Sequence, residues 1–563
     1  MKILFSSLLR IGDLITHWRL IQQYRIDHPS VEVHLLVNDT SESFAKYLLQ
    51  KREIAGYFIV PRDRWQTYLI EPGRPPMRTF FEFQELVATL AAVRFDKVYE
   101  LSHSLFAARL LDALPIASKI GVRYENGRAA GLLNRWSELL NEDYSERASV
   151  AFHSLHVLAK SLDLVVPVLA EPRQSDDRFR DLILLQISTS DTKKQWSMPR
   201  WVDLTKRLRQ EYPTLRIQIL AAPGEAHALR KSLLQVSSNF SFAEVPVVEA
   251  GWSKLDEMFQ ETRLLISLDT SVLHFAAALR VPTLSFFIGS ANPQKTAPYQ
   301  NEALILSGRV SCSPCRHRDP CHQPQHLCAE ALDLREIVTA TRSLLDGQVA
   351  AQSGQWRVGQ SQRRALIYKV TTQEESMEKV SSALAQMTWQ IYLDGADQEV
   401  AAPVGSGAHT FLDEHASGLF AAGGLSWLKE RLDASEADSL FLEEVQSRAV
   451  RAGSRLVVDD SSQADEFEKK TQDLKRSLNE YLARQSTGDR ECRDFFFQLR
   501  SALSSHFLGF VKLRRVTQAA DEARRLLFLE QKFVRTLINE ITERGPGYVA
   551  GFGKTSHDRS ATT

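Results

Sequence analysis

The chain has 563 residues, and its 69 lysines and arginines are balanced by 69 aspartates and glutamates, so the formal net charge is zero. This length predicts two to four domains, and the balanced charge argues against a general nucleic-acid-binding protein. No apolar run reaches the roughly 18 residues that a membrane helix needs. The opening residues lack a cleavage site and read as a first strand, so we expect a cytoplasmic protein.

Residues 1–165 alternate short apolar segments with amphipathic ones. KILFSSLL (2–9) precedes the helical DLITHWRLIQQYRIDHP, and VEVHLLVN (31–38) precedes SESFAKYLLQKRE. A third apolar run, IAGYFIVPR, is followed after a helical segment by DKVYELSH (96–103). Strands that alternate with helices predict a parallel sheet with helices on its faces, and we expect residues 1–165 to form one Rossmann-like domain.

A polar, proline-containing stretch at 166–180 interrupts this pattern, and a second alternating series follows it. The predicted strands of this series are DLILLQIST (181–189), LRIQILAAP (215–223), LLISLD (264–269) and TLSFFIG (283–289). We expect a second Rossmann-like domain over residues 180–345. Two such domains would face each other across a cleft at the carboxyl ends of their strands, where these sheets bind ligands.

The composition changes after residue 345. The Gln-, Ser- and Gly-rich stretch 346–362 is typical of a linker. Helical spacing of apolar residues then predicts a mainly α-helical domain over residues 365–550. We expect this domain to pack, to self-associate or to bind a partner.

Gly12 and Asp13 lie in the turn between the first strand and the first helix. A carboxylate at this point could take a proton from a hydroxyl group, and the glycine would let a substrate approach the backbone. The alternative is an aspartate that only favours the helix dipole.

The loop ISTSDTKKQW (187–196) carries the hydroxyl groups of Thr189 and Ser190 and the ammonium group of Lys194. These groups suit a phosphate or diphosphate, although the glycines of a Walker A loop are absent. The alternative is a solvated, charged loop.

Asp269 ends a predicted strand, and Thr270 and Ser271 begin the helix SVLHFAAALR. Backbone N–H groups at the helix start could bind an anion while the carboxylate accepts hydrogen bonds from sugar hydroxyls. A plain helix N-cap is the alternative. His274, one turn further on, is interpreted as a structural helix histidine and not as a catalytic residue.

Four of the five cysteines fall within 17 residues, and they are Cys312, Cys315, Cys321 and Cys328. Thiolates at this spacing could hold a structural zinc or iron ion, with one of the nearby histidines His317, His322 and His326 as a possible substitute. Four reduced, unliganded thiols are the alternative.

The order and spacing of these motifs resemble the bacterial heptosyltransferases of glycosyltransferase family 9, which assemble the lipopolysaccharide core. The matching stretches lie between residue 1 and about residue 345, and they are RIGD, LSHSLFAARLLDALPIASKIGVR, TSDTKKQW, DTSVLHFAAAL and GSANPQKTAPY. The cysteine stretch is similar to one in some members of the family. Ser271 stands where a glycine is usual, IGSANP replaces a GPTDP-like loop, and the region 350–563 has no counterpart.

This resemblance implies an α/β GT-B fold, with the acceptor bound by the first domain and the nucleotide sugar by the second. It implies an inverting glycosyltransferase that moves heptose from ADP-L-glycero-β-D-manno-heptose to a hydroxyl of the lipopolysaccharide inner core. No cofactor would be needed for catalysis. The enzyme could sit peripherally on the inner face of the inner membrane.

The resemblance also assigns roles to single residues. Asp13 matches the general base and Lys194 the residue that meets the donor phosphates, with Thr189 and Ser190 beside it. Asp269 matches the carboxylate that holds the heptose, and Thr270 and Ser271 match the backbone at the diphosphate. Glu225 falls near a ribose-binding acid. Arg62, Arg64 and Arg123 are the candidates for binding an anionic acceptor.

Three alternatives stay open. One is a protein O-heptosyltransferase that modifies a surface protein such as an autotransporter or flagellin. A second is a sugar-nucleotide epimerase of the same fold, and a third is a non-catalytic scaffold that binds nucleotide sugars.

Overall fold

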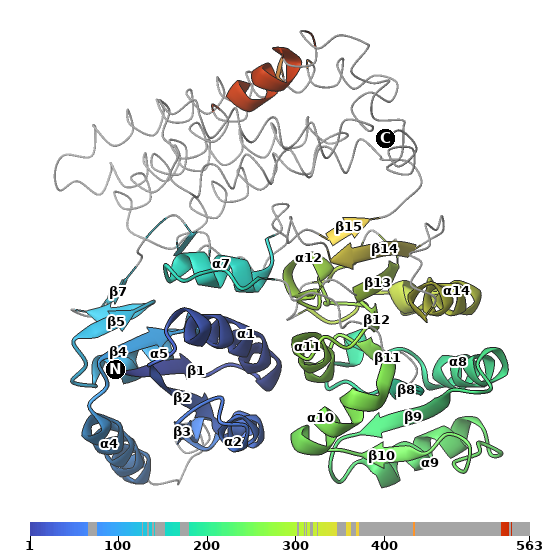
Figure 1. The fold of residues 1–563 in the computed structure, drawn as a ribbon, viewed down its shortest axis with the longest axis horizontal. Coiled ribbons are helices and arrows are strands. Elements are labelled where there is room, and N and C mark those ends of the chain that lie inside the picture. Colours follow the sequence, from blue (N-terminus) through green and yellow to red (C-terminus); the bar gives the residue numbers. More distant parts are fainter. Residues whose placement is uncertain are drawn as a thin grey trace, which may run out of the picture. The chain divides into compact units, whose positions relative to one another are not determined.

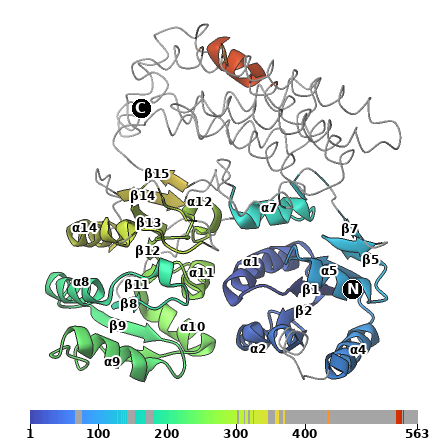
Figure 2. The ribbon, with the colours of Figure 1, turned by 180° about the vertical axis from the view of Figure 1, so that it is seen from behind.

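The structure is a computed structural model, shown in Figures 1 and 2. It divides into two compact units, of which the first holds residues 1–147 and 152–373 and the second holds residues 148–151 and 374–563. It describes residues 1–65, 76–125, 128–131, 152–168, 180–300, 303–308, 312–315, 319–323, 325–345, 356–361, 368–370 and 531–539, with a few single residues between these ranges.

The first sheet has five strands in the order β3-β2-β1-β4-β5, and all of their pairings are parallel. The strands are β1 (Lys2–Ser7), β2 (Glu32–Asn38), β3 (Gly56–Val60), β4 (Lys97–Glu100) and β5 (Ser118–Ile120). The helices of this part are α1 (Ile11–Asp27), α2 (Glu42–Gln50), α4 (Pro76–Val93), α5 (Leu105–Asp112) and α7 (Ser154–Ser161), with the short hairpin β6 (Arg123–Glu125) and β7 (Arg128–Ala130). Side chains of α1 and α2 cover one face of the sheet, and those of α4 and α5 cover the other.

The second sheet has eight strands in the order β10-β9-β8-β11-β12-β13-β14-β15, and its first six strands are parallel. The strands are β8 (Leu182–Gln186), β9 (Arg216–Ala221), β10 (Val247–Glu249), β11 (Thr262–Leu268), β12 (Thr283–Phe286), β13 (Ala303–Gly308), β14 (Trp356–Ser361) and β15 (Tyr368–Val370). The helices are α8 (Met198–Glu211), α9 (Ala226–Val236), α10 (Trp252–Glu261), α11 (Ser271–Ala278), α12 (Pro293–Thr296), α13 (Leu327–Glu330) and α14 (Leu334–Leu345). Two parallel α/β sheets are therefore present.

The prediction of a linker at residues 346–362 is wrong in part. Strand β14 lies within it and pairs antiparallel with β13, and β15 in turn pairs with β14. The polar composition suggested flexibility, but an antiparallel strand is held by backbone hydrogen bonds, which do not require an apolar sequence.

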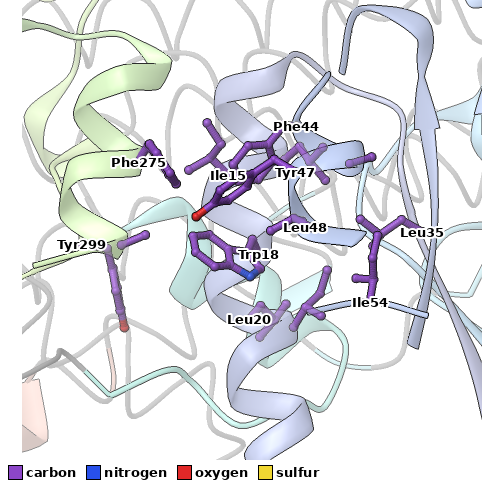
Figure 3. Close-up of a cluster of buried hydrophobic side chains, with 14 of the residues drawn as sticks. Ile15, Trp18, Leu20, Leu35, Phe44, Tyr47, Leu48, Ile54, Phe275 and Tyr299 are labelled. Atoms are coloured by element: carbon purple, nitrogen blue, oxygen red, sulfur yellow. The ribbon is translucent and has the colours of Figure 1, made fainter. Parts of the chain in front are cut away.

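Helices α10 and α11 cover the face of the second sheet that meets the first half of the chain, while α8, α9 and α14 cover the opposite face. Buried side chains of α1 and α2 join those of α10 and α11 in one continuous core. Figure 3 shows Phe275 of α11 directed toward Trp18, Phe44 and Tyr47. This packing holds the starts of α1 and α11 near each other.

The predicted helical domain 365–550 lies largely outside the described residues. In the second unit the structure describes residues 531–539 as helical, with Phe533, Val534 and Leu537 fully buried. Among the described residues of the whole chain, none of the helices is long and apolar enough to cross a membrane.

Candidate active site

Asp13 lies in the first turn of α1, immediately beyond the carboxyl end of the central strand β1. Its Oδ2 accepts a hydrogen bond from the backbone N–H of Arg10 at 3.2 Å, so the carboxylate also caps the helix. The side chain is exposed at this point. The catalytic and the capping interpretations of Asp13 are therefore compatible, since one oxygen can cap while the carboxylate faces solvent.

The turn that carries Asp13 meets the start of α11. A Cβ added at Gly12 would lie 3.8 Å from the Cα of Ser271 and 3.9 Å from Cδ2 of His274. One side of the Asp13 carboxylate is open to solvent, but the protein atoms around it remove part of its hydration, and this desolvation raises its pKa. The hydrogen bond from the Arg10 N–H and the electrostatic effects of His274 and Arg10 oppose the shift. A carboxylate with a raised pKa is a better proton acceptor, as a general base requires.

Asp269 is the buried acid of the site and follows strand β11. Its Oδ2 lies 2.6 Å from Nζ of Lys194, and its Oδ1 lies 3.5 Å from Nε2 of His274. Burial alone would raise the pKa of Asp269, but the hydrogen bond from His274 and the charge of Lys194 hold it at about 2. Asp269 therefore stays ionised at neutral pH and fixes the direction of the Lys194 ammonium group.

Thr270 is the N-cap residue of α11, and Ser271 is the first residue of the helix. The Thr270 hydroxyl donates to Oε1 of Gln186 at 3.4 Å, and its side chain does not cap the helix. The first backbone N–H groups of a helix have no partner within the helix. They are therefore suited to bind an anion beside Lys194.

The loop 189–194 is held by Asp191. The Asp191 carboxylate accepts from the Lys193 backbone N–H at 3.0 Å, and its own N–H donates to the Thr189 hydroxyl at 3.3 Å. Lys194 ends the short 3₁₀ helix η3 (Thr192–Lys194), and Ser190 is exposed. The structure thus brings Lys194 to Asp269, and it leaves Ser190 open to solvent.

Glu225 is the N-cap residue of α9 at the carboxyl end of β9 and is exposed. Its side chain does not cap the helix. A hydrogen bond to the start of α9 comes instead from Glu249, whose Oε1 accepts from the Ala226 N–H at 2.9 Å. Glu225 lies at the edge of the sheet where a ligand would bind, and its assignment to ribose stays a prediction.

The three candidate acceptor arginines lie in different surroundings. Arg62 donates to the carbonyl of Leu8, at the end of β1, at 3.2 Å. Arg64 instead pairs with Glu82 of α4 at 2.9 Å. Arg123 lines a cavity of about 180 Å³ together with the buried Glu100. Arg62 is therefore the arginine that lies beside the strand leading to Asp13, while Arg64 is engaged on α4.

The four cysteines carry free thiols. Burial raises the pKa of Cys328, and the thiols of Cys315, Cys312 and Cys321 add to this shift. Within the described ranges, however, no three His, Cys, Asp or Glu side chains are arranged to hold a metal ion. As placed, the thiols do not form a ligand shell. The metal site stays a prediction, and no chemical step below involves a metal.

His274 is the site residue that the sequence analysis set aside. Its Nε2 lies 3.5 Å from Asp269, and its ring lies close to the Gly12 turn. One signal could have indicated this position, because residue 274 lies four after Thr270 and so on the same face of the helix. The distance to Asp13, however, depends on how the two halves pack.

The pKa of Asp269 leads to a prediction about stability. Its folded pKa of about 2 lies below its ordinary 3.8, so its ionisation stabilises the folded state by about 2 kcal/mol above pH 4, and this contribution is lost as the pH falls toward 2. We expect the difference in unfolding free energy between the native chain and Asp269→Asn to shrink between pH 6 and about pH 3. Urea unfolding across this range measures it, with the exposed Asp203→Asn as control. A difference that does not change with pH would contradict the assignment.

Residues 83–326 match the family model described as glycosyltransferase family 9 (heptosyltransferase). The chain is also similar to lipopolysaccharide heptosyltransferase 1 of Pseudomonas aeruginosa, with 26% identity over 376 residues that cover 61% of this chain and 98% of that protein. Two solved structures are similar as well. The E. coli heptosyltransferase WaaC with ADP has 17% identity, a TM-score of 0.42, and coverage of 60% of this chain and 99% of that one. The iron-containing dodecameric glycosyltransferase TibC of enterotoxigenic E. coli H10407 has 12% identity, a TM-score of 0.36, and coverage of 62% and 80%.

Proposed function

We propose that the protein moves heptose from ADP-L-glycero-β-D-manno-heptose to a hydroxyl of the lipopolysaccharide inner core. The premise is that residues 83–326 form a glycosyltransferase family 9 (heptosyltransferase) domain, so that the chain is a glycosyltransferase. We propose inversion at the anomeric carbon and a GT-B arrangement of the two sheets. The similarity to lipopolysaccharide heptosyltransferase 1 supports heptose as the transferred sugar and lipopolysaccharide as the acceptor. The enzyme would act in the cytoplasm, where nucleotide sugars are made.

One observation carries the proposal, namely the approach of the Gly12–Asp13 turn to Ser271 and His274. In the proposed reaction the turn supplies the proton acceptor and the start of α11 binds the anion, and this approach supports having both at one site. An inverting transfer needs both groups, because the acceptor hydroxyl loses a proton while the leaving diphosphate gains charge.

In the proposed reaction the Asp13 carboxylate takes the proton of the acceptor hydroxyl, whose oxygen bonds to the anomeric carbon of the heptose. The bond from that carbon to the diphosphate oxygen breaks, and ADP leaves from the opposite face. Lys194 and the first N–H groups of α11 stabilise the charge on the diphosphate. Asp269 keeps Lys194 in place, and its oxygens can accept further hydrogen bonds from heptose hydroxyls.

Donor turnover tests this proposal directly. We expect release of ADP from ADP-heptose only when a heptose-deficient lipopolysaccharide acceptor is present, and no release from UDP- or GDP-sugars. Mass spectrometry of the acceptor should show one added heptose. Release of ADP at the same rate with and without the acceptor would overturn the assignment, and so would turnover of UDP-sugars but not of ADP-heptose.

A protein acceptor is the second candidate, and the length of the chain supports it. The Pseudomonas relative is matched over 98% of its length but covers only 61% of this chain, so this chain contains a large region that the relative lacks. Such a region could present a protein substrate. Heptose transfer to a co-expressed surface protein, with none to lipopolysaccharide, would decide for this candidate.

A further inference from the structure

The cysteine segment, defined here as the described residues within 312–332, contacts the loop that carries Lys194. Gly289, which follows strand β12, is the meeting point of the two. Its N–H donates to Sγ of Cys328 at 3.3 Å, and its carbonyl accepts from the N–H of Cys315 at 2.8 Å. Cysteines on both sides of this glycine thus fix its backbone.

Gly289 in turn packs closely against the loop 189–194. Its φ is +63°, and a Cβ at this position would lie 2.1 Å from the carbonyl oxygen of Lys193. Only glycine allows both this conformation and this approach. The neighbouring Ser290 donates to Oδ2 of Asp191, the residue that caps the loop, at 3.0 Å.

The cysteine segment also holds the loop directly. Nζ of Lys193 donates to the carbonyl of Asp319 at 2.7 Å. Just beyond the loop, Nε1 of Trp196 donates to the carbonyl of Ala329 at 3.2 Å, and Arg200 pairs with Glu330 at 2.6 Å. The loop and the residues just after it are therefore fixed to the cysteine segment at several points.

From these contacts we propose that the cysteine segment is a positioning element of the donor site. Through Gly289 and Lys193 it fixes the backbone from which Lys194 reaches Asp269 at 2.6 Å, and so it sets where the ammonium group meets the donor diphosphate. The role rests on the proposed function, and it requires no metal. Lys193 acts here as a positioning residue, since its ammonium group donates to the Asp319 carbonyl, whereas that of Lys194 pairs with Asp269.

Calorimetric titration of ADP into the full chain tests the proposal. Lys193→Met removes one charge-assisted hydrogen bond and should raise the Kd for ADP about tenfold, with the KM for acceptor unchanged. Cys328→Ala should act in the same direction, and Cys328→Ser should act less, because its hydroxyl still accepts from Gly289. The exposed Lys206→Met on α8 is the matched control and should leave the Kd unchanged.

A second measurement separates positioning from direct contact with the phosphates. If Lys193 acts through Lys194, Lys193→Met should have little further effect in the Lys194→Met background. Additive effects, or an unchanged Kd in Lys193→Met, would overturn the proposal. So would a loss of affinity that follows bound metal content across the cysteine variants. Failure of the native chain to bind ADP would instead refute the proposed function, and this inference would fall with it.

Discussion

Asp13→Asn should lower kcat for heptose transfer by about 10²–10⁴-fold, since asparagine cannot take the proton of the acceptor hydroxyl. The change should leave ADP affinity intact, because in the proposed function Lys194 and α11, from the other half of the chain, bind the diphosphate. The substituted amide oxygen can still accept from the Arg10 N–H, so α1 keeps its cap. Single-turnover kinetics with calorimetry of ADP binding separate the two effects.

The pH dependence offers an independent check of the same residue. Partial desolvation raises the pKa of Asp13 above its ordinary 3.8, so the base loses activity as the pH falls through that raised value. The decrease in kcat/KM at acidic pH should therefore have its midpoint above pH 3.8, and it should be absent from the residual activity of Asp13→Asn.

The raised pKa of Asp13 also leads to a prediction about stability. The folded state binds the Asp13 proton more tightly than the unfolded state does, so ionisation of Asp13 opposes folding. At pH 7 the variant should then be at least as stable as the native chain, and a destabilised variant would show that Asp13 is mainly a structural cap.

Phe275→Ala should lower the free energy of unfolding of the first unit by about 3–5 kcal/mol. The ring is fully buried and packs against five aromatic side chains at centroid distances of 5.4–6.3 Å, those of Trp18, Phe44, Tyr47, Trp252 and Phe259. Trp18, Phe44 and Tyr47 come from the first half of the chain, as Figure 3 shows for these three. Removing the ring opens a cavity where α1 and α11 meet.

The same substitution should lower kcat per folded molecule, since α11 carries Ser271 and His274 and α1 carries Asp13. Phe275→Leu keeps much of the apolar volume and should lose less in both stability and kcat. Urea unfolding and transfer kinetics at a temperature where all variants are folded provide the comparison. Lower stability with an unchanged kcat would show that the aromatic contact supports the fold without aligning the site.

Much of the fold could be read from the sequence. The alternation of buried strands with amphipathic helices predicted both parallel sheets, because a strand covered on two faces must be apolar throughout. The family resemblance was confirmed over residues 83–326. Strand β14 was missed, since its pairing with β13 is made by backbone groups that leave no mark in the side-chain pattern.

The candidate site, like the fold, could be predicted from the sequence only in part. By itself the sequence determined where Asp13, Lys194 and Asp269 stand in their turns, since a strand that ends before a helix places its next residues at the ligand edge of the sheet. Only the tertiary structure decided that Lys194 pairs with Asp269, that His274 reaches both Asp269 and the Gly12 turn, and that the cysteine segment supports the Lys194 loop. Lys194 and Asp269 lie 75 positions apart, Lys193 and Asp319 lie 126 positions apart, and His274 and the Gly12 turn lie in different halves of the chain. Their geometry depends on how whole helices pack, and local spacing carries no information about that.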